Sequence, residues 1–127
     1  MKNIRQVVYF NAKPKDVYGA LMESKKHSAF TGGDVKVSRK VGGKMIMEGA
    51  IEGINTELVQ DKKIVQKWRY IDWPKGHYSK ATFKFEKSKD GTRLTFVQEG
   101  VPDDKYEDIY EGWIEYYWRP LKEFLEK

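Results

Sequence analysis

The C-terminal segment, residues 103–125, repeats apolar side chains every three or four positions. This spacing places them in one stripe along an α-helix, and such a stripe must be buried against another element. Aromatic residues dominate the stripe, which is formed by Tyr106, Ile109, Tyr110, Trp113, Ile114, Tyr117, Leu121, Phe124 and Leu125. The fold must therefore offer this helix a broad apolar surface. Pro120 has no N–H for the carbonyl of Tyr116, so the sequence predicts an interruption of the helix with a kink there.

Residues 34–99 change to a period of two, which is typical of half-buried β-strands. Met45 and Met47 alternate with polar neighbours after a Gly42-Gly43 turn, and Gly53 indicates a bulge or bend within a strand over 51–58. Further strands are predicted at 64–70, at 79–86 and, after a hairpin turn at Asp90-Gly91, at 94–98. Six strands joined by tight turns predict an antiparallel meander with one solvated face.

The N-terminal part adds a strand over residues 2–10 and two short helices, the first beginning near Pro14 and the second ending at Gly32-Gly33. This order predicts an α+β helix-grip fold, in which a curved antiparallel sheet of about six or seven strands surrounds the long C-terminal helix. No repeat or linker divides the chain, so residues 1–127 are predicted to form a single domain.

Nine motifs in this order resemble the family named after the activator of heat-shock protein 90 ATPase, within the START-like (birch-pollen-allergen-like, SRPBCC) superfamily. They are HSAFTGG at 27–33, GGKM at 42–45, GAIEGINTEL at 49–58, IVQKWR at 64–69, WP at 73–74, GTRL at 91–94, QEGVP at 98–102, GW at 112–113 and YYWRPL at 116–121. The eukaryotic activator has two domains, and the resemblance is to its C-terminal one. It implies the helix-grip fold, a chaperone partner and a role in the stress response. The superfamily also implies binding of small apolar molecules.

Composition restricts the compartment and the partners. The chain lacks cysteine and has no window approaching the ~20 apolar residues of a membrane span, so we expect a cytoplasmic protein without membrane contact. The net charge is +5, but residues 101–127 carry four basic and eight acidic side chains, so the basic excess lies in the preceding part. Its lysines are spread singly along predicted strands without an arginine cluster, which favours a solvated sheet face over nucleic-acid binding. Because the long helix hides its stripe within its own domain, we expect a monomer.

Catalytic and metal-binding motifs are not evident. His27 and His77 have no partner at metal-ligand spacing, and neither a nucleophile elbow nor a phosphate-binding loop occurs. The sequence therefore predicts no catalytic residue, no metal and no cofactor, and favours a non-enzymatic role. A small cyclase or hydrolase that uses Glu57 with a tyrosine remains an alternative.

Polar residues on predicted inward faces are the main candidates for a binding site. Asn55 and Glu57 share the parity of Ile51, and Gln66 and Gln98 share that of apolar neighbours in their strands. If buried, these groups must bond one another, trapped water or a ligand. Together with the aromatic residues and methionines that face them they define a candidate apolar ligand cavity between sheet and helix, formed by Met45, Met47, Asn55, Glu57, Gln66, Trp68, Tyr70, Phe83, Phe96, Gln98, Tyr110, Trp113 and Tyr117. A satisfied internal network and a filled core are the alternative interpretation.

Overall fold

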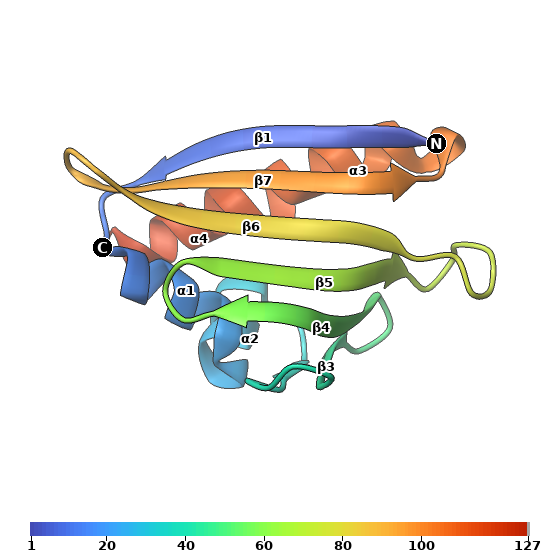
Figure 1. Ribbon diagram of the computed structural model, residues 1–127, viewed down its shortest axis with the longest axis horizontal. Helices are drawn as coiled ribbons and strands as arrows, with labels where there is room; N and C mark the ends of the chain where they lie inside the picture. Colours follow the sequence, from blue (N-terminus) through green and yellow to red (C-terminus); the bar gives the residue numbers. More distant parts are fainter. Residues whose placement is uncertain (127) are drawn as a thin grey trace.

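The computed structural model describes residues 1–126 and consists of one curved sheet, two short helices and a long C-terminal helix (Figure 1). In chain order the elements are β1 (Lys2–Phe10), α1 (Pro14–Met22), α2 (Ser24–Thr31), β2 (Val35–Val37), β3 (Lys44–Met47), β4 (Ile51–Val59), β5 (Lys63–Tyr70), β6 (Ser79–Ser88), β7 (Gly91–Val101), η1 (Asp103–Lys105), α3 (Tyr106–Gly112), η2 (Trp113–Trp118) and α4 (Arg119–Leu125). The predicted α+β helix-grip architecture is confirmed.

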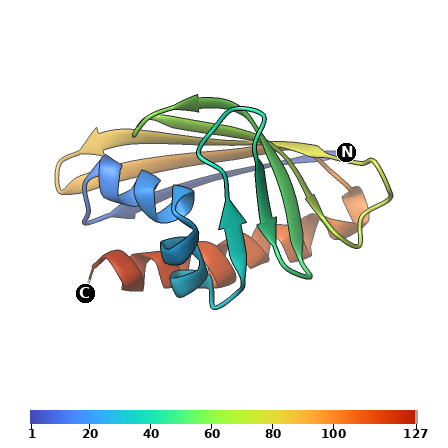
Figure 2. The ribbon, with the colours of Figure 1, turned by 90° about the horizontal axis from the view of Figure 1, so that it is seen from below.

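The sheet is antiparallel throughout, with the strand order β1-β7-β6-β5-β4-β3-β2. The six strands that follow the helices form a meander because each is joined to the next by a short turn. β1 pairs with β7, so the first strand lies beside the last one. Figure 2 shows the long helix running along the concave side of this sheet.

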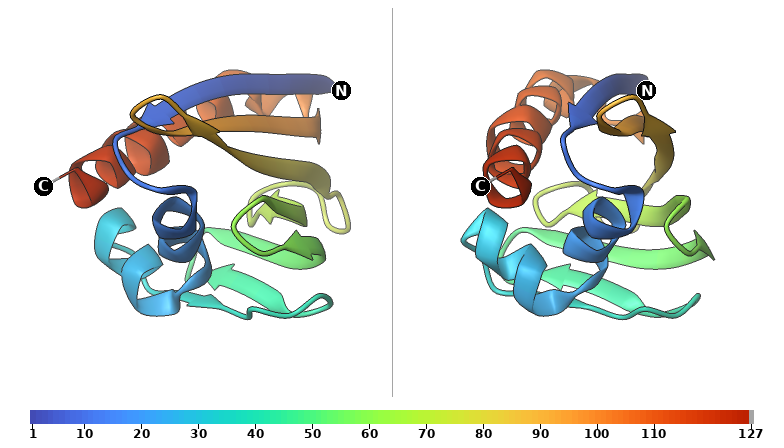
Figure 3. Two further views of the ribbon diagram at one scale, coloured as in Figure 1. Left: turned by 60° about the vertical axis from the view of Figure 1, so that its left-hand side comes forward. Right: turned by 90° about the vertical axis from the view of Figure 1, so that its left-hand side faces the viewer.

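The two short helices lie on the same side of the sheet as the long helix (Figure 3). α1 begins with Pro14, where the missing N–H leaves no hydrogen bond unmade. α2 ends at Gly32, whose φ of 76° is the left-handed conformation that glycine adopts most readily. α2 contacts both β2 and α4, so it joins the far edge of the sheet to the end of the long helix.

The interruption predicted near Pro120 takes the form of a π-helical turn, η2, directly before α4. The N–H of Arg119 donates to the carbonyl of Ile114, five residues earlier. A π turn holds one more residue per turn than an α turn, so it rotates the residues after it relative to the predicted stripe. As a result Trp118 is buried and stacks on Trp113, with ring centroids 5.4 Å apart, whereas Tyr116 is 70% exposed.

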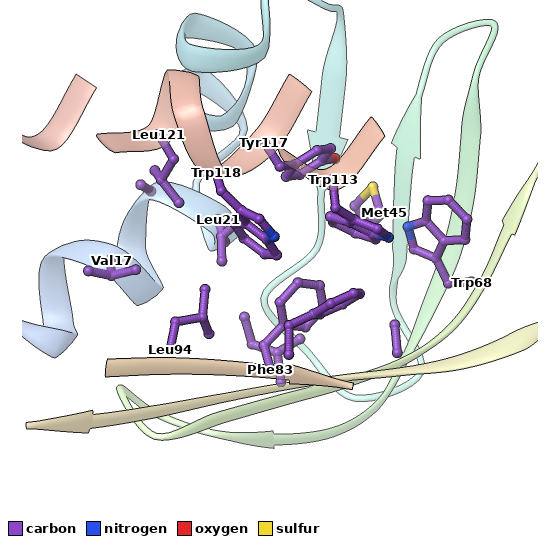
Figure 4. Close-up of a cluster of buried hydrophobic side chains, with 14 of the residues drawn as sticks. Val17, Leu21, Met45, Trp68, Phe83, Leu94, Trp113, Tyr117, Trp118 and Leu121 are labelled. Atoms are coloured by element: carbon purple, nitrogen blue, oxygen red, sulfur yellow. The ribbon is translucent and has the colours of Figure 1, made fainter. Parts of the chain in front are cut away.

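The core lies between the concave face of the sheet and this helix. Figure 4 shows Trp113 and Trp118 reaching from the helix toward Phe83 and Leu94 of the sheet, with Tyr117 lying along the helix beside Trp113. Phe96 is the closest aromatic neighbour of Trp113, with ring centroids 4.3 Å apart. Most of the predicted aromatic set therefore fills a core, as one of the two interpretations of the sequence held.

Candidate functional site

A groove of about 500 Å³ separates the long helix from the β3–β5 part of the sheet. The helix leans toward β1, where the carbonyl of Tyr110 accepts a hydrogen bond from Gln6, and this leaves the opposite side of the helix uncovered. Apolar and aromatic side chains dominate the lining, which consists of Thr31, Met47, Ala50, Ile51, Trp68, Tyr70, Asp72, Trp73, Lys105, Asp108, Ile109, Gly112, Trp113, Tyr116 and Tyr117. The size and chemistry are those of a small-molecule site.

Two tryptophan side chains form one wall of the groove. Trp68 and Trp73 are 2% and 3% exposed, and their rings meet edge to face with centroids 5.4 Å apart. Among the described residues neither indole N–H has a hydrogen-bond acceptor, although both nitrogens are buried. Figure 4 shows the nitrogen of Trp68 on the side of its ring that faces Trp113. Each unsatisfied donor of this kind costs about 1–3 kcal/mol.

Arg69 holds the loop that carries Trp73. Its guanidinium donates to the carbonyl of Trp73 at 2.6 Å and to a carboxylate oxygen of Glu52 at 3.1 Å. The Arg69 side chain is 11% exposed and Glu52 is 48% exposed, so the bond to Trp73 is the better shielded of the two. Trp73 is thus fixed against the sheet.

An ion pair crosses the mouth of the groove. Lys105 at the start of the long helix lies 3.2 Å from the carboxylate of Asp72 in the loop after β5. The pKa of Lys105 is raised by its hydrogen bond to this carboxylate. Both side chains remain accessible to water, so the pair closes the mouth only weakly.

Five of the predicted cavity residues line the groove, namely Met47, Trp68, Tyr70, Trp113 and Tyr117. Three others, Met45, Gln66 and Phe83, surround a separate void of about 10 Å³. That void is barely large enough for one water molecule. Phe96 packs against Trp113, and Tyr110 is half-buried on the helix face nearer to β1.

Gln98 links the sheet to the helix through a continuous chain of hydrogen bonds. The Trp113 indole donates to Gln98 Oε1 at 2.8 Å, Gln98 Nε2 donates to Ser79 Oγ at 2.9 Å, and Ser79 Oγ donates to the carbonyl of Trp68 at 2.8 Å. A second link of this kind runs from the Trp118 indole to Gln6 Oε1 at 2.7 Å. Neither Gln6 nor Trp118 is among the predicted cavity residues, although Gln6 alternates with its strand neighbours in the same way as Gln98 and so faces inward.

Asn55 and Gln66 form a second polar cluster, away from the groove. Gln66 Nε2 donates to Asn55 Oδ1 at 3.0 Å, and Asn55 Nδ2 donates to the carbonyls of Ser38 and Lys40. Asn55 therefore anchors the loop between β2 and β3. The three buried amides Asn55, Gln66 and Gln98 all bond protein groups, which supports an internal network and not a ligand-orienting role.

The prediction that Glu57 faces inward is wrong. The bulge in β4 lies between Asn55 and Glu57, two residues after the predicted position at Gly53. One extra residue turns the following side chains to the other face, so Leu58 and not Glu57 continues the inward row. The Glu57 side chain is 52% exposed and pairs with Lys63 at 3.2 Å. It is neither a cavity residue nor a shielded proton-transfer group.

His27, for which the sequence predicts neither a metal nor a catalytic role, is buried. Its Nδ1 lies 2.9 Å from the carbonyl oxygen of Leu21, which can only accept, so Nδ1 carries the proton. Nε2 then accepts a hydrogen bond from the Tyr117 hydroxyl at 2.8 Å. Burial lowers the pKa of His27 to about 4 and raises that of Tyr117. The pair is neutral and supports the wall of the groove from behind.

Metal chemistry finds no support within residues 1–126, where no three His, Cys, Asp or Glu side chains gather closely enough to hold an ion. None of the helices in this described part is long and apolar enough to cross a membrane. The groove with its two tryptophans is the main candidate site.

Comparisons with known proteins identify the relatives of this chain. It is 38% identical over 116 residues to the activator of 90 kDa heat shock protein ATPase homolog of Dictyostelium discoideum, covering 88% of this chain and 30% of that protein. It is 32% identical over 115 residues to homolog 1 of Homo sapiens, covering 90% of this chain and 34% of that protein. The chain thus spans about a third of the length of these relatives.

Solved structures agree with this relationship. The structure of an HSP90 activator from Plasmodium falciparum superposes with a TM-score of 0.91 at 26% identity, covering 99% of this chain and 97% of that chain. Residues 11–126 also match the family described as activator of Hsp90 ATPase homolog 1-like protein, which includes almost every element described above. The chain belongs to the activator of Hsp90 ATPase homolog 1-like family.

Proposed function

We propose that this chain, acting as one START-like domain, is an interaction module that binds an Hsp90-type chaperone and changes its ATPase rate. The observation that carries the proposal is the 38% identity to a named activator homolog over 116 residues, which run through both sheet and helix. A role in the stress response follows from such a partner. The relatives are about three times longer, so the proposal concerns the part of their activity that this domain can perform alone.

A domain without catalytic groups can activate another enzyme only by differential binding. It must bind the hydrolytically competent conformation of the chaperone more tightly than the resting one. A tenfold rise in the population of the competent state requires affinities that differ by about 1.4 kcal/mol. A single small docking surface is sufficient for a difference of this size.

The direct test measures ATP hydrolysis by the Hsp90-type chaperone of the same organism as this domain is titrated in. We expect a saturable change in rate, with a midpoint equal to the dissociation constant measured by isothermal titration calorimetry. A chaperone variant that cannot hydrolyse ATP serves as the control for contaminating activity. If the domain neither associates with the chaperone nor changes its ATPase rate, the proposal is refuted.

Binding of a small apolar ligand is a second candidate function, favoured by one specific observation. The groove of about 500 Å³ has a wall with two buried indole N–H groups that lack acceptors within the described chain. A flat or acyl-like molecule would fill the apolar space, and its carbonyl or carboxylate would accept from either indole once a shift of the ring uncovers the nitrogen. Native mass spectrometry of the purified protein, followed by titration with an apolar fluorescent probe, tests this function.

Gly112 provides a matched pair of variants for that titration. It lines the groove, and a Cβ there meets only Tyr116 Cδ2, at 3.8 Å. Gly112→Leu should fill part of the groove and abolish probe binding, whereas Gly112→Ala should retain it. Both variants should be at least as stable as the parent because glycine is the poorer helix former by about 1 kcal/mol. Equal probe binding by all three proteins would exclude the groove as the site.

A further inference from the structure

The outer face of the sheet carries a compact group of lysines at its centre. Figure 1 looks onto this face, with the long helix behind it. Lys67 of β5 lies directly opposite Lys80 of β6, and Lys63 lies opposite Lys84. Between the two pairs, Val65 lies opposite Thr82. We refer to these six residues, Lys63, Val65, Lys67, Lys80, Thr82 and Lys84, as the lysine block.

Like charges in directly opposed positions of neighbouring strands are unfavourable, since their Cβ atoms lie only about 5 Å apart. The block contains two such pairs in the middle of the sheet, where a sequence selected for stability alone would alternate the signs. Only Lys63 has an ion-pair partner among the described residues, namely Glu57. The block therefore retains most of its positive charge.

Two acidic side chains of the same face are engaged outside the block. Glu52 pairs with Arg69 at 3.1 Å and Glu86 pairs with Arg93 at 2.9 Å. Glu99 lies opposite Lys80 on β7, but no ion pair joins them within the described structure. Ion pairs thus surround the block and leave its centre available for carboxylates from another molecule.

The floor of the block indicates what kind of molecule fits. Val65 is buried beneath the lysine side chains, and Thr82 and the adjacent Val97 are half-buried, so the floor is flat and weakly polar. The block has neither an arginine fork for phosphate nor an aromatic ring on which a base could stack. Lysines around such a floor match the carboxylates and short side chains of an acidic protein surface. The opposite charges of the two surfaces would also accelerate their association.

We propose that the lysine block is the surface through which this domain docks onto an acidic surface of its protein partner. The inference rests on the proposed chaperone-linked function, for which it names the contact. The like-charged pairs lower the stability of the free domain, and a partner's carboxylates relieve their repulsion in the complex.

The test uses the double variant Lys67→Glu/Lys84→Glu. Each new glutamate faces a lysine on the neighbouring strand, and its other cross-strand neighbour is Ile54 or Thr95, both uncharged. We expect a melting temperature at or above that of the parent, together with at least a tenfold loss of affinity for the chaperone. Affinity of the parent should fall steeply with salt, and the slope should be smaller for the variant.

Lys13→Glu/Lys15→Glu is the matched control. It changes the net charge equally but lies at the start of α1, on the other side of the sheet, and should leave affinity unchanged. Equal affinity of the parent and the block variant, or an equal loss in the control, overturns the inference and leaves the proposed function standing. If the parent domain does not bind the chaperone, both the inference about the lysine block and the proposed function are refuted. Lysine-dependent binding of a random-sequence DNA duplex or of phosphatidylserine vesicles, with chaperone binding unaffected, also overturns it.

Discussion

Replacement of Gln98 by leucine should release the long helix from the sheet at the point where the helix forms the groove wall. Gln98 is fully buried and makes two hydrogen bonds, accepting from the Trp113 indole and donating to Ser79 Oγ. Leucine has a similar volume but can make neither bond. The indole N–H of Trp113 would then be a third unsatisfied indole donor, in addition to those of Trp68 and Trp73.

The expected cost follows from these two bonds. A stranded buried donor costs about 1–3 kcal/mol, and Ser79 loses one partner but keeps its own donation to the carbonyl of Trp68. Leucine offsets part of this because it needs no partner of its own. We expect a net loss of about 2 kcal/mol in the free energy of unfolding, or a fall in melting temperature on the order of 8 °C for a domain of this size.

A double-mutant cycle with Trp113→Phe isolates the hydrogen bond from the change in packing. Phenylalanine has no N–H, so Gln98→Leu should cost about 1–2 kcal/mol less in that background than in the parent. The free energies come from urea unfolding of all four proteins, and unchanged m-values establish that the unfolded states are comparable. Additive effects within about 0.5 kcal/mol would show that the Trp113–Gln98 bond contributes nothing to stability.

Three further predictions concern the surroundings of the groove. The pKa of His27 is lowered from 6.5 to about 4 in the folded state, so the unfolded chain binds a proton first as the pH falls. Stability should therefore be full above pH 6.5 and fall by about 3 kcal/mol toward pH 4, and melting curves of His27→Gln should lack this dependence. Arg69→Met should increase amide hydrogen exchange in residues 71–76 by about tenfold or more, because the carbonyl of Trp73 loses its charged donor; unchanged exchange would mean that other contacts hold the loop. Asn55→Ala removes both bonds to the loop 38–43 and should cost about 2–3 kcal/mol in urea unfolding, with retention of groove-probe binding as the check that the loop is not part of the site.

The fold could be predicted because its elements are long and strongly periodic. The alternation in residues 79–86 indicates a strand over several residue pairs, and the aromatic spacing from Tyr106 to Leu125 indicates a helix over several turns. An error at one position therefore changes little in either prediction. The β6–β7 hairpin closes through a two-residue turn at Lys89-Asp90, between the paired residues Ser88 and Gly91, one residue before the predicted Asp90-Gly91 turn. Topology then follows, since short turns allow few alternatives to a meander.

Two irregularities of the backbone explain most of the errors at the level of single residues. The extra residue in β4 reverses the side of the sheet on which Glu57 lies, and the π turn brings Trp118, which lay outside the predicted apolar stripe, into the core. Neither irregularity has a period of its own in the sequence. Both arise because tertiary packing outweighs regular hydrogen bonding at one point of a strand or helix.

Hydrogen-bond satisfaction separates the structural polar groups from the candidate functional ones. Inward parity alone selected Asn55, Gln66 and Gln98, and in the structure each of these amides is bonded to other protein groups. A group whose bonds are already made gains nothing from a ligand, so these positions are better explained by fold specificity. The indole N–H groups of Trp68 and Trp73 are the opposite case, because they are buried without an acceptor in the described chain and belong to residues that line the groove. An acceptor on a bound small molecule would recover their cost to the folded domain, and this asymmetry, more than the shape of the groove, is the reason to propose the β3–β5 side for a small ligand, separate from the lysine block proposed for the protein partner.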